Sequence, residues 1–215
     1  FRKDMTEIKT VTEKVKHKGA YPESAIIDGV EKALAFLNDK SIEPLYRICI
    51  FHYLLEYIHP FYDGNGRLGR FILSYGISEN LETLLAYRIS GTIKENINKY
   101  YKAFDICNDK RNRGDLTPFL IMMLDMLKDS ALELRSSLSE KLKRWDYYEH
   151  ILDTYPESKG SKRMELLYSL LVQAALFSDL GISTRDLKEQ LNVSYVTLKG
   201  LLEQVEGTGL LCSRR

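Results

Sequence analysis

One stretch of this chain gathers side chains suited to phosphate chemistry. Residues 59–70 read HPFYDGNGRLGR, and Gly64 and Gly66 stand directly before a helical pattern. Glycines let consecutive backbone N–H groups turn toward one anion, and the positive end of the following helix attracts the anion further. Arg67 and Arg70 are three residues apart, so they share a helix face and can donate to the same anion. The stretch is therefore typical of a polyphosphate site.

Two further side chains in the same stretch could act on a bound phosphate. Asp63 precedes the glycines, and its carboxylate oxygens are hard ligands suited to Mg²⁺. His59 stands at the other end of the loop, and an imidazole that titrates near neutral pH commonly accepts a proton from an attacking hydroxyl. A glycine loop or a lone histidine is weak evidence by itself. Because both occur within the same twelve residues, we predict His59 as a general base and Asp63 as a metal ligand.

Helical patterns on the N-terminal side lead directly into this stretch. After Pro22, apolar residues recur at three- and four-residue spacing as far as Leu37, which predicts an amphipathic helix. Pro44 stands at a favourable first-turn position for a second helix that reaches Ile58. Pro60 disfavours helical geometry at the residue before it, so we expect the second helix to end at the histidine.

The pattern beyond the loop is also helical. Four apolar residues recur at helical spacing and predict the buried face of a third helix, namely Leu68, Phe71, Ile72 and Tyr75. A further helix is predicted from Ser90, a suitable N-cap, through Phe104, and another from Pro118 through Leu127. The exception lies near the N-terminus, where residues 5–15 are rich in Thr, Val and Ile and predict a short strand pair or an extended flap over about residues 5–20.

The C-terminal part of the chain predicts a second, smaller domain. Turn-forming residues at 154–161 interrupt the helical pattern. Beyond them, Ser183 and Ser194 are placed to cap two short helices, which predicts a helix-turn-helix with residues 207–211 as a wing strand. The expected organisation is a main domain, a linker and a small domain over residues 1–140, 141–160 and 161–215.

Composition and charge narrow the class of protein. The 215 residues are 44% hydrophobic and 28% charged, as in soluble globular proteins. Lys and Arg total 31 against 30 Asp and Glu, so no overall field favours nucleic acid or anionic lipid. The apolar stretches are shorter than the roughly 18 residues that a membrane helix needs, so we predict no membrane span. Three cysteines without CxxC spacing argue against a disulfide framework and favour a reducing cytoplasm.

With these residues in view, the sequence resembles the Fic (filamentation induced by cAMP) family. HPFYDGNGRLGR matches the family signature HPFx[D/E]GNGRxxR at every specified position. The resemblance covers about residues 1–130 and includes Phe1–Arg2 before the flap. It implies an all-α, Fic-type helical core with a short β-hairpin flap, to which the small winged helix-turn-helix domain is appended. The activity it implies is transfer of AMP from ATP to a hydroxyl side chain of a target protein, with Mg²⁺ as cofactor.

The resemblance also implies roles for individual residues. It makes His59 the base and Asp63 the Mg²⁺ ligand. It assigns two groups of residues to ATP: Gly64, Asn65, Gly66, Arg67 and Arg70 to the phosphates, and Tyr100, Tyr101 and Asn108 to the adenine. The flap, between Ile8 and Gly19, is expected to pin an extended segment of the target by strand addition.

Several alternatives stay open at this point. The loop recognises phosphates more than a base, so transfer of another phosphate-linked group, such as UMP or phosphocholine, is one of them. The C-terminal domain raises a second alternative, that the protein is a DNA-binding regulator whose Fic domain is secondary. From Ser161 onward seven cations face six acids, and Lys199 is the only cation between Tyr195 and Glu206, so we favour protein contact over DNA. Self-modification and a homodimer are further open alternatives.

The other three histidines receive no functional role. His52 lies in an apolar helical stripe, which argues against a zinc site. His17 is expected to be a solvated flap residue, and His150 a surface or packing residue.

The chain begins with Phe1 rather than Met, which we interpret as a fragment. Many Fic proteins carry an inhibitory helix, [S/T]xxxE[G/N], whose glutamate pairs with the second signature arginine, here Arg70. No complete copy of that pattern occurs in this sequence. We therefore expect the glutamate to have been removed or to be supplied by a partner, and this chain to be less restrained than the complete protein.

Overall fold

A computed structural model describes residues 1–9 and 15–207, and the chain divides into two compact units, Phe1–Leu134 and Arg135–Arg215. Each unit has its own apolar core. The boundary falls inside helix α6 (Thr117–Thr154), earlier than the expected boundary at residue 140. The difference arises because much of the expected linker is a continuation of this helix, so no break in structure marks the end of the first unit.

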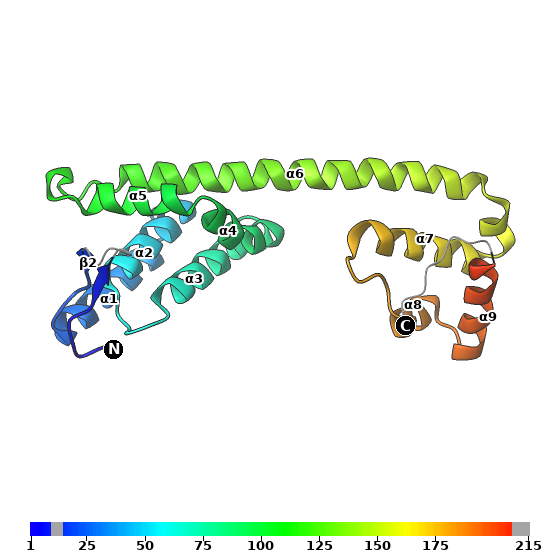
Figure 1. Ribbon diagram of the computed structural model, residues 1–215, viewed down its shortest axis with the longest axis horizontal. Helices are drawn as coiled ribbons and strands as arrows, with labels where there is room; N and C mark the ends of the chain where they lie inside the picture. The colour runs from blue at the N-terminus through cyan, green and yellow to red at the C-terminus, as the bar shows by residue number, and fades with distance from the viewer. Residues whose placement is uncertain (10–14, 208–215) are drawn as a thin grey trace. The chain divides into compact units, whose positions relative to one another are not determined.

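The first unit contains a short hairpin and six helices or parts of helices within its described residues (Figure 1). The hairpin pairs β1 (Glu7–Lys9) antiparallel with β2 (Val15–Lys18), which confirms the predicted strand pair. The other elements follow in chain order: α1 (Glu23–Asn38), α2 (Pro44–Ile58), α3 (Asn65–Asn80), α4 (Thr83–Glu95), α5 (Ile97–Asn108), the 3₁₀ turn η1 (Lys110–Asn112) and the start of α6.

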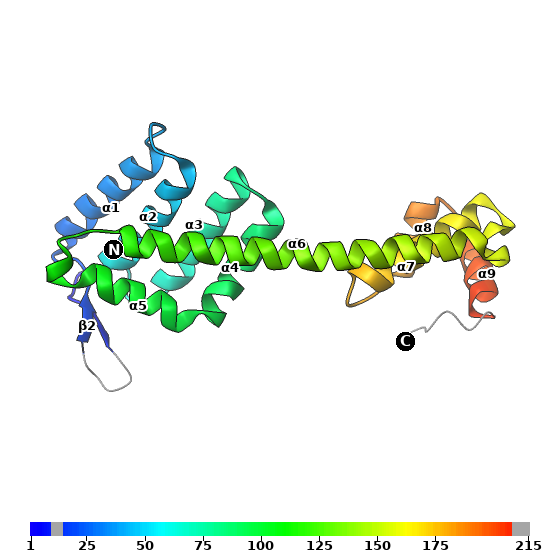
Figure 2. The same cartoon turned by 90° about the horizontal axis from the view of Figure 1, so that it is seen from above.

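Helix α2 is the centre of this unit. Eight of its side chains are buried, and six of these contribute to two apolar clusters, one shared mainly with α1 and the other with α3 to α6. Figures 1 and 2 show α2 and α3 side by side, with α5 and the start of α6 packed across them. Because α2 is enclosed in this way, its C-terminal end, directly before His59, is held in place by the core.

The buried face of α3 differs from the predicted one. Leu68 and Ile72 do pack against the core, but Phe71 and Tyr75 are 68% and 59% exposed, so the prediction was wrong for both aromatic residues. The buried residues of α3 are Asn65, Gly69, Leu73 and Ile77.

Glycine explains why this other face of α3 is the one that packs. A Cβ built on Gly76 would lie 2.9 Å from a side-chain carbon of Ile48, and one built on Gly69 would lie 3.1 Å from Nδ1 of His52. Both distances are shorter than ordinary van der Waals contact. Two glycines seven residues apart therefore let the backbone of α3 approach α2 closely, and the bulky aromatic residues lie on the opposite side.

The predicted helix from Ser90 to Phe104 is two helices. Ser90 lies inside α4, so its assignment as an N-cap was wrong. The break falls at Asn96, whose side-chain amide donates to the Thr92 carbonyl at 3.0 Å. Asparagine amides compete in this way for backbone groups near helix ends. The new helix, α5, then begins at Ile97.

The second unit is built from short helices. After α6 come the 3₁₀ segment η2 (Pro156–Gly160), then α7 (Lys162–Phe177), α8 (Thr184–Leu191) and α9 (Tyr195–Glu206). The Ser183 and Ser194 hydroxyls accept hydrogen bonds from backbone N–H groups one turn into α8 and α9, both at 3.1 Å, which confirms both predicted caps. The predicted wing strand falls almost entirely on residues from 208 onward, outside the described residues.

Within residues 1–9 and 15–207, no helix combines the length and apolar character that crossing a bilayer requires.

Candidate active site

The glycine loop presents the free N-terminus of α3. Gly64 is the N-cap residue and adopts a left-handed φ of 85°, which glycine tolerates at no steric cost. The first intrahelical hydrogen bond runs from the Leu68 N–H to the Gly64 carbonyl at 2.9 Å. The N–H groups of the three preceding residues, 65–67, therefore lack an intrahelical acceptor, and Gly64 has no side chain to accept from them. This end of α3 is well suited to a phosphate.

Asn65 braces the loop from inside. Its side chain is buried, its amide nitrogen donates to the Phe61 carbonyl at 2.7 Å, and its amide oxygen accepts from the Phe61 N–H at 3.0 Å. Both polar atoms of the side chain are thus engaged by the loop itself. The side chain therefore shapes the loop, and the backbone N–H of Asn65 is the group that can face a phosphate, so Asn65 stays a predicted phosphate-binding residue.

Asp63 and Arg67 form an ion pair on the exposed surface of the loop. A guanidinium nitrogen of Arg67 lies 2.9 Å from Oδ2 of Asp63, and the two side chains are 76% and 89% exposed. The other carboxylate oxygen of Asp63 accepts from the Gly64 N–H at 2.6 Å. An ion pair this exposed contributes only about 0–1 kcal/mol. Breaking this ion pair therefore costs little free energy, so each side chain can contact a ligand in place of the other.

Arg70 lies beneath the loop, one turn further along α3. A Cβ built on Gly66 would lie 3.2 Å from a terminal nitrogen of Arg70, so the guanidinium lies close to this glycine. Among the described residues, no carboxylate comes within ion-pair distance of it. Arg67 and Arg70 therefore both place cations close to the glycines of the loop.

His59 follows α2 in a left-handed conformation, with φ of 51° and ψ of 61°. Such a conformation costs a residue with a Cβ roughly 1–2 kcal/mol. Burial lowers the pKa of the imidazole; a contact with the Glu56 backbone opposes this, and positive charge on Arg2 and His17 lowers the pKa further. A histidine whose pKa lies below its ordinary value is neutral at physiological pH. His59 is therefore in the state that can accept a proton.

The residues expected around the adenine occupy different environments. Tyr100 is buried, and its hydroxyl is 2.9 Å from Nε2 of His52. A side chain in the core cannot line an open pocket, so we no longer assign Tyr100 to the adenine. Tyr101 is 52% exposed, and the Asn108 amide oxygen accepts from the Tyr53 hydroxyl at 2.6 Å. Tyr101 and Asn108 stay predictions.

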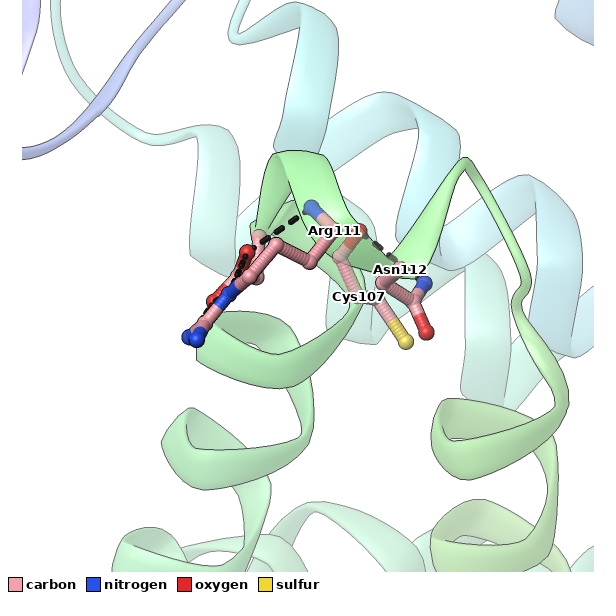
Figure 3. Close-up of polar contacts among 4 residues, drawn as sticks. Cys107, Arg111 and Asn112 are labelled. Carbon is pink, nitrogen blue, oxygen red and sulfur yellow. Dashed lines mark hydrogen bonds and ion pairs between the residues drawn. The ribbon is translucent and has the colours of Figure 1, made fainter.

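The turn after Asn108 is held by its own polar contacts (Figure 3). The side-chain amide of Asn112 donates to the Asp115 carbonyl at 2.6 Å and to the Cys107 carbonyl at 3.4 Å. Arg111 forms an ion pair with Asp109 at 2.7 Å. These contacts define the C-terminal end of α5, where the adenine-side segment was expected.

Two other histidines have partners that bear on the sequence predictions. His52 is buried as expected, and within the described residues no cluster of three or more His, Cys, Asp or Glu could hold a metal ion. His17 was expected to be solvated, but its Nε2 lies 2.6 Å from the Tyr57 carbonyl and its ring lies against the Tyr57 ring. His17 is thus a partly exposed flap residue, as expected, that also contacts the end of α2.

Glu56 is a residue of the site that the sequence analysis missed. It stands one turn before His59, and its buried Oε1 has no hydrogen-bond partner among the described residues. Burial raises the pKa of this carboxyl to about 7, and nearby Arg70 opposes the change. The available signal was a single acid inside an otherwise apolar helix.

We expect Glu56→Gln to stabilise the protein at high pH only. The folded-state pKa is raised from 4.5 to about 7, so the folded protein keeps a proton that the unfolded chain releases, and stability falls as pH rises through this window. The wild type therefore loses up to about 3 kcal/mol by pH 8, and the neutral amide avoids this loss. Urea denaturation should give similar stabilities for both proteins at pH 4 and a more stable variant at pH 8. Glu31→Gln, on the exposed side of α1, is the control, and a gain for Glu56→Gln of equal size at both pH values would contradict the assignment.

The end of α2 and the start of α3 thus bring together a histidine, free helix N–H groups and two arginines, groups that are suited to binding phosphate. Residues 1–76 match the Fic/DOC family. A probable protein adenylyltransferase of Aquifex aeolicus (strain VF5) is 29% identical over 174 residues, which cover 80% of this chain and 48% of that protein. A protein adenylyltransferase of Caenorhabditis elegans is 31% identical over 98 residues, covering 44% and 18% of the two chains.

A solved structure agrees with these relatives. The crystal structure of a Fic family protein from Desulfovibrio desulfuricans G20 superposes with a TM-score of 0.57 at 26% identity, covering 97% of this chain and 55% of that one. The N-terminal part of the chain is therefore similar to Fic family proteins in both sequence and fold. It spans about half the length of the Aquifex and Desulfovibrio proteins.

Proposed function

We propose that this protein transfers AMP from ATP to a hydroxyl side chain of a target protein. The observation that carries the proposal is the loop between α2 and α3, which links His59, at the end of α2, to three free helix N–H groups and two arginines at the start of α3. The relatives named protein adenylyltransferase support the same reaction.

We assign each residue of the loop a separate role in the reaction. His59 accepts the proton of the target hydroxyl as its oxygen attacks the α-phosphorus of ATP; the new P–O bond forms, and the bond to the β-phosphate oxygen breaks, so pyrophosphate leaves. The N–H groups of residues 65–67, with Arg67 and Arg70, hold the phosphates and neutralise the charge that develops on them. Because hydrogen bonds from Asn65 to Phe61 already hold the loop in shape, little reorganisation is needed at the moment of reaction.

A magnesium ion fits the remaining side chain of the loop. Mg²⁺ is commonly held by one or two carboxylates together with substrate phosphates, and Asp63 supplies one exposed carboxylate at the loop mouth. When bound, the ion would neutralise phosphate charge. Asp63 would hold it and in doing so would release Arg67 toward the nucleotide.

The second unit contributes contacts rather than chemistry in this proposal. The start of α9 exposes Tyr195 and Val196, and Lys199 lies 3.7 Å from Glu203 within the same helix. Apolar side chains and a paired cation suit a protein surface better than a DNA duplex.

A cytoplasmic location stays part of the proposal, since Cys49 and Cys107 are buried free thiols.

The position of the transferred label tests the proposed reaction. Protein substrates, including the chain itself, are incubated with ATP labelled at either the α- or the γ-phosphate. We expect protein-bound label from α-labelled ATP alone, since pyrophosphate leaves with the other two phosphates. UTP and CDP-choline, labelled at the phosphate next to the nucleoside or choline, distinguish the other transfer reactions. Label transferred from the γ-position, or from none of these donors, would contradict the proposal.

A further inference from the structure

We propose that Arg2 is a positioning residue for His59, which holds the turn that presents the general base and joins it to the start of the flap. The inference rests on the proposed function, because it gives His59 the role of base. It concerns a residue 57 positions away in the chain, outside the glycine loop.

The guanidinium of Arg2 is buried among backbone carbonyls. The side chain is 1% exposed. Its Nε donates to the His59 carbonyl at 2.7 Å, and its terminal nitrogens donate to the carbonyls of Asp4 at 2.6 Å, Ile58 at 3.4 Å and Ala20. The Arg2 backbone N–H also donates to the Pro60 carbonyl at 3.0 Å. One residue therefore contacts three consecutive carbonyls at the end of α2.

The described partners of the Arg2 guanidinium are carbonyls rather than carboxylates. Among the described residues, no carboxylate lies within ion-pair distance of Arg2. Burying a charge is costly unless partners replace its hydration. Here the replacement comes from carbonyls that belong to the His59 turn and to the flap base. The free energy of burying the guanidinium is thus offset only when both segments are in place around it.

The turn at His59 needs such support. Its left-handed conformation is unfavourable for a residue with a Cβ, and the flap base packs directly against it. Ala20 donates its N–H to the Ile58 carbonyl at 3.0 Å. A Cβ built on Gly19 would lie 2.5 Å from a terminal nitrogen of Arg2 and 3.0 Å from the His59 Cβ. Arg2, Gly19 and His59 therefore pack closely together. In this contact Arg2 fixes the position of the His59 backbone from which the imidazole extends.

The charge of Arg2 acts in the same direction as its geometry. The groups that bear on the imidazole are Arg2 from the N-terminal segment, His17 from β2, and the Glu56 backbone from α2. The positive charge of Arg2 favours the neutral imidazole. Removing that charge is therefore expected to make His59 easier to protonate as well as less well oriented.

A second buried arginine provides a matched control. Arg47 is 7% exposed, lies in the first turn of α2, and donates to the Leu37 carbonyl at 2.8 Å. It stands at the opposite end of α2 from His59. Arg47→Gln therefore reports what the loss of a buried, carbonyl-bound guanidinium does to folding alone.

The kinetic test compares Arg2→Gln, Arg2→Lys and Arg47→Gln. We expect Arg2→Gln to lower kcat on the order of 10²-fold, the loss typical of a misplaced catalytic group, with KM for ATP unchanged because the phosphate loop is intact. Arg2→Lys keeps the charge but not the fork of donors, so it should recover part of kcat. If Arg2→Gln does not fold, Arg2→Lys carries the comparison and should still lose kcat against Arg47→Gln. A kcat for both Arg2 variants equal to that of Arg47→Gln would overturn the inference.

A spectroscopic test separates this inference from the proposed function. The chain has 4 histidines, so the ring resonance of His59 can be assigned by its loss in His59→Ala. Arg2→Gln should shift this resonance and raise its titration midpoint, and Arg47→Gln should change neither. A response at His59 in a protein that transfers no AMP would sink the proposed function and leave the positioning contact standing. An unchanged His59 resonance and midpoint in Arg2→Gln would overturn the inference whatever the activity.

Discussion

Replacing His59 with alanine is expected to lower the rate of AMP transfer by about 10²–10⁴-fold, the range that a general base supplies. The reason is the neutral state of this imidazole, which burial and nearby positive charge maintain. Without it, the target hydroxyl must lose its proton to water. The proposal gives the His59 ring no contact with the phosphates of ATP, so binding of ATP should persist. The rate is measured with α-labelled ATP under conditions where the label on protein grows linearly.

The control for His59→Ala is His150→Ala, at an exposed position of α6 in the second unit. It should transfer label at the wild-type rate. Equal rates for His59→Ala and the wild type would remove the histidine from the mechanism. A loss of ATP binding in His59→Ala, together with a lowered melting temperature, would mean that the substitution damages the loop rather than the proton transfer.

Replacing Arg67 with alanine should have the next largest effect. Loss of one fixed donor to developing charge costs on the order of 10²–10³ in rate at comparable sites. The stability of the folded protein should hardly change, because the exposed pair with Asp63 contributes only about 0–1 kcal/mol. We expect kcat/KM for ATP to fall by this factor while the urea midpoint stays near that of the wild type.

Lys199→Ala, in α9, is the comparison for Arg67→Ala. It removes the same charge at the start of the second unit's last helix, where the proposal places no nucleotide contact, and should leave kcat/KM unchanged. Equal losses in the two variants would indicate a general effect of charge rather than a phosphate contact. DNA binding that depends on salt and disappears in Lys199→Ala would instead favour a regulator that binds duplex DNA.

Local rules were sufficient for the elements that lead into the loop. Proline at position 44 and proline at position 60 set the limits of α2, and the structure places its ends where these residues predict. The caps of α8 and α9 followed from Ser183 and Ser194 for the same reason, since a cap is made within one turn of chain. The glycine loop before α3 is likewise a local feature.

Tertiary contacts decided the features that the sequence analysis missed. Apolar spacing marked Phe71 and Tyr75 as buried, but Gly69 and Gly76 allowed a closer approach of backbones on another face of α3. Tyr100 was assigned to a pocket and instead reaches His52 across the core. Long-range partners of this kind leave no periodic signal.

The two polar residues behind the site illustrate the same limit. Arg2 contacts the His59 turn from 57 positions away in the chain, and the carboxylate of Glu56 lies against Gly69 of α3, which follows it in the chain. Neither residue stands in a sequence motif whose spacing indicates which residue it contacts. Both became assignable only when the fold placed them beside the end of α2.

The central claim is that the loop joins AMP to a protein hydroxyl through His59. Its most direct test is mass spectrometry of peptides from a protein mixture incubated with ATP and either the wild type or His59→Ala. The account predicts Ser, Thr or Tyr side chains carrying AMP after incubation with the wild type and close to none with the variant. Phosphate adducts in place of AMP, or AMP adducts at equal levels with both proteins, would contradict it.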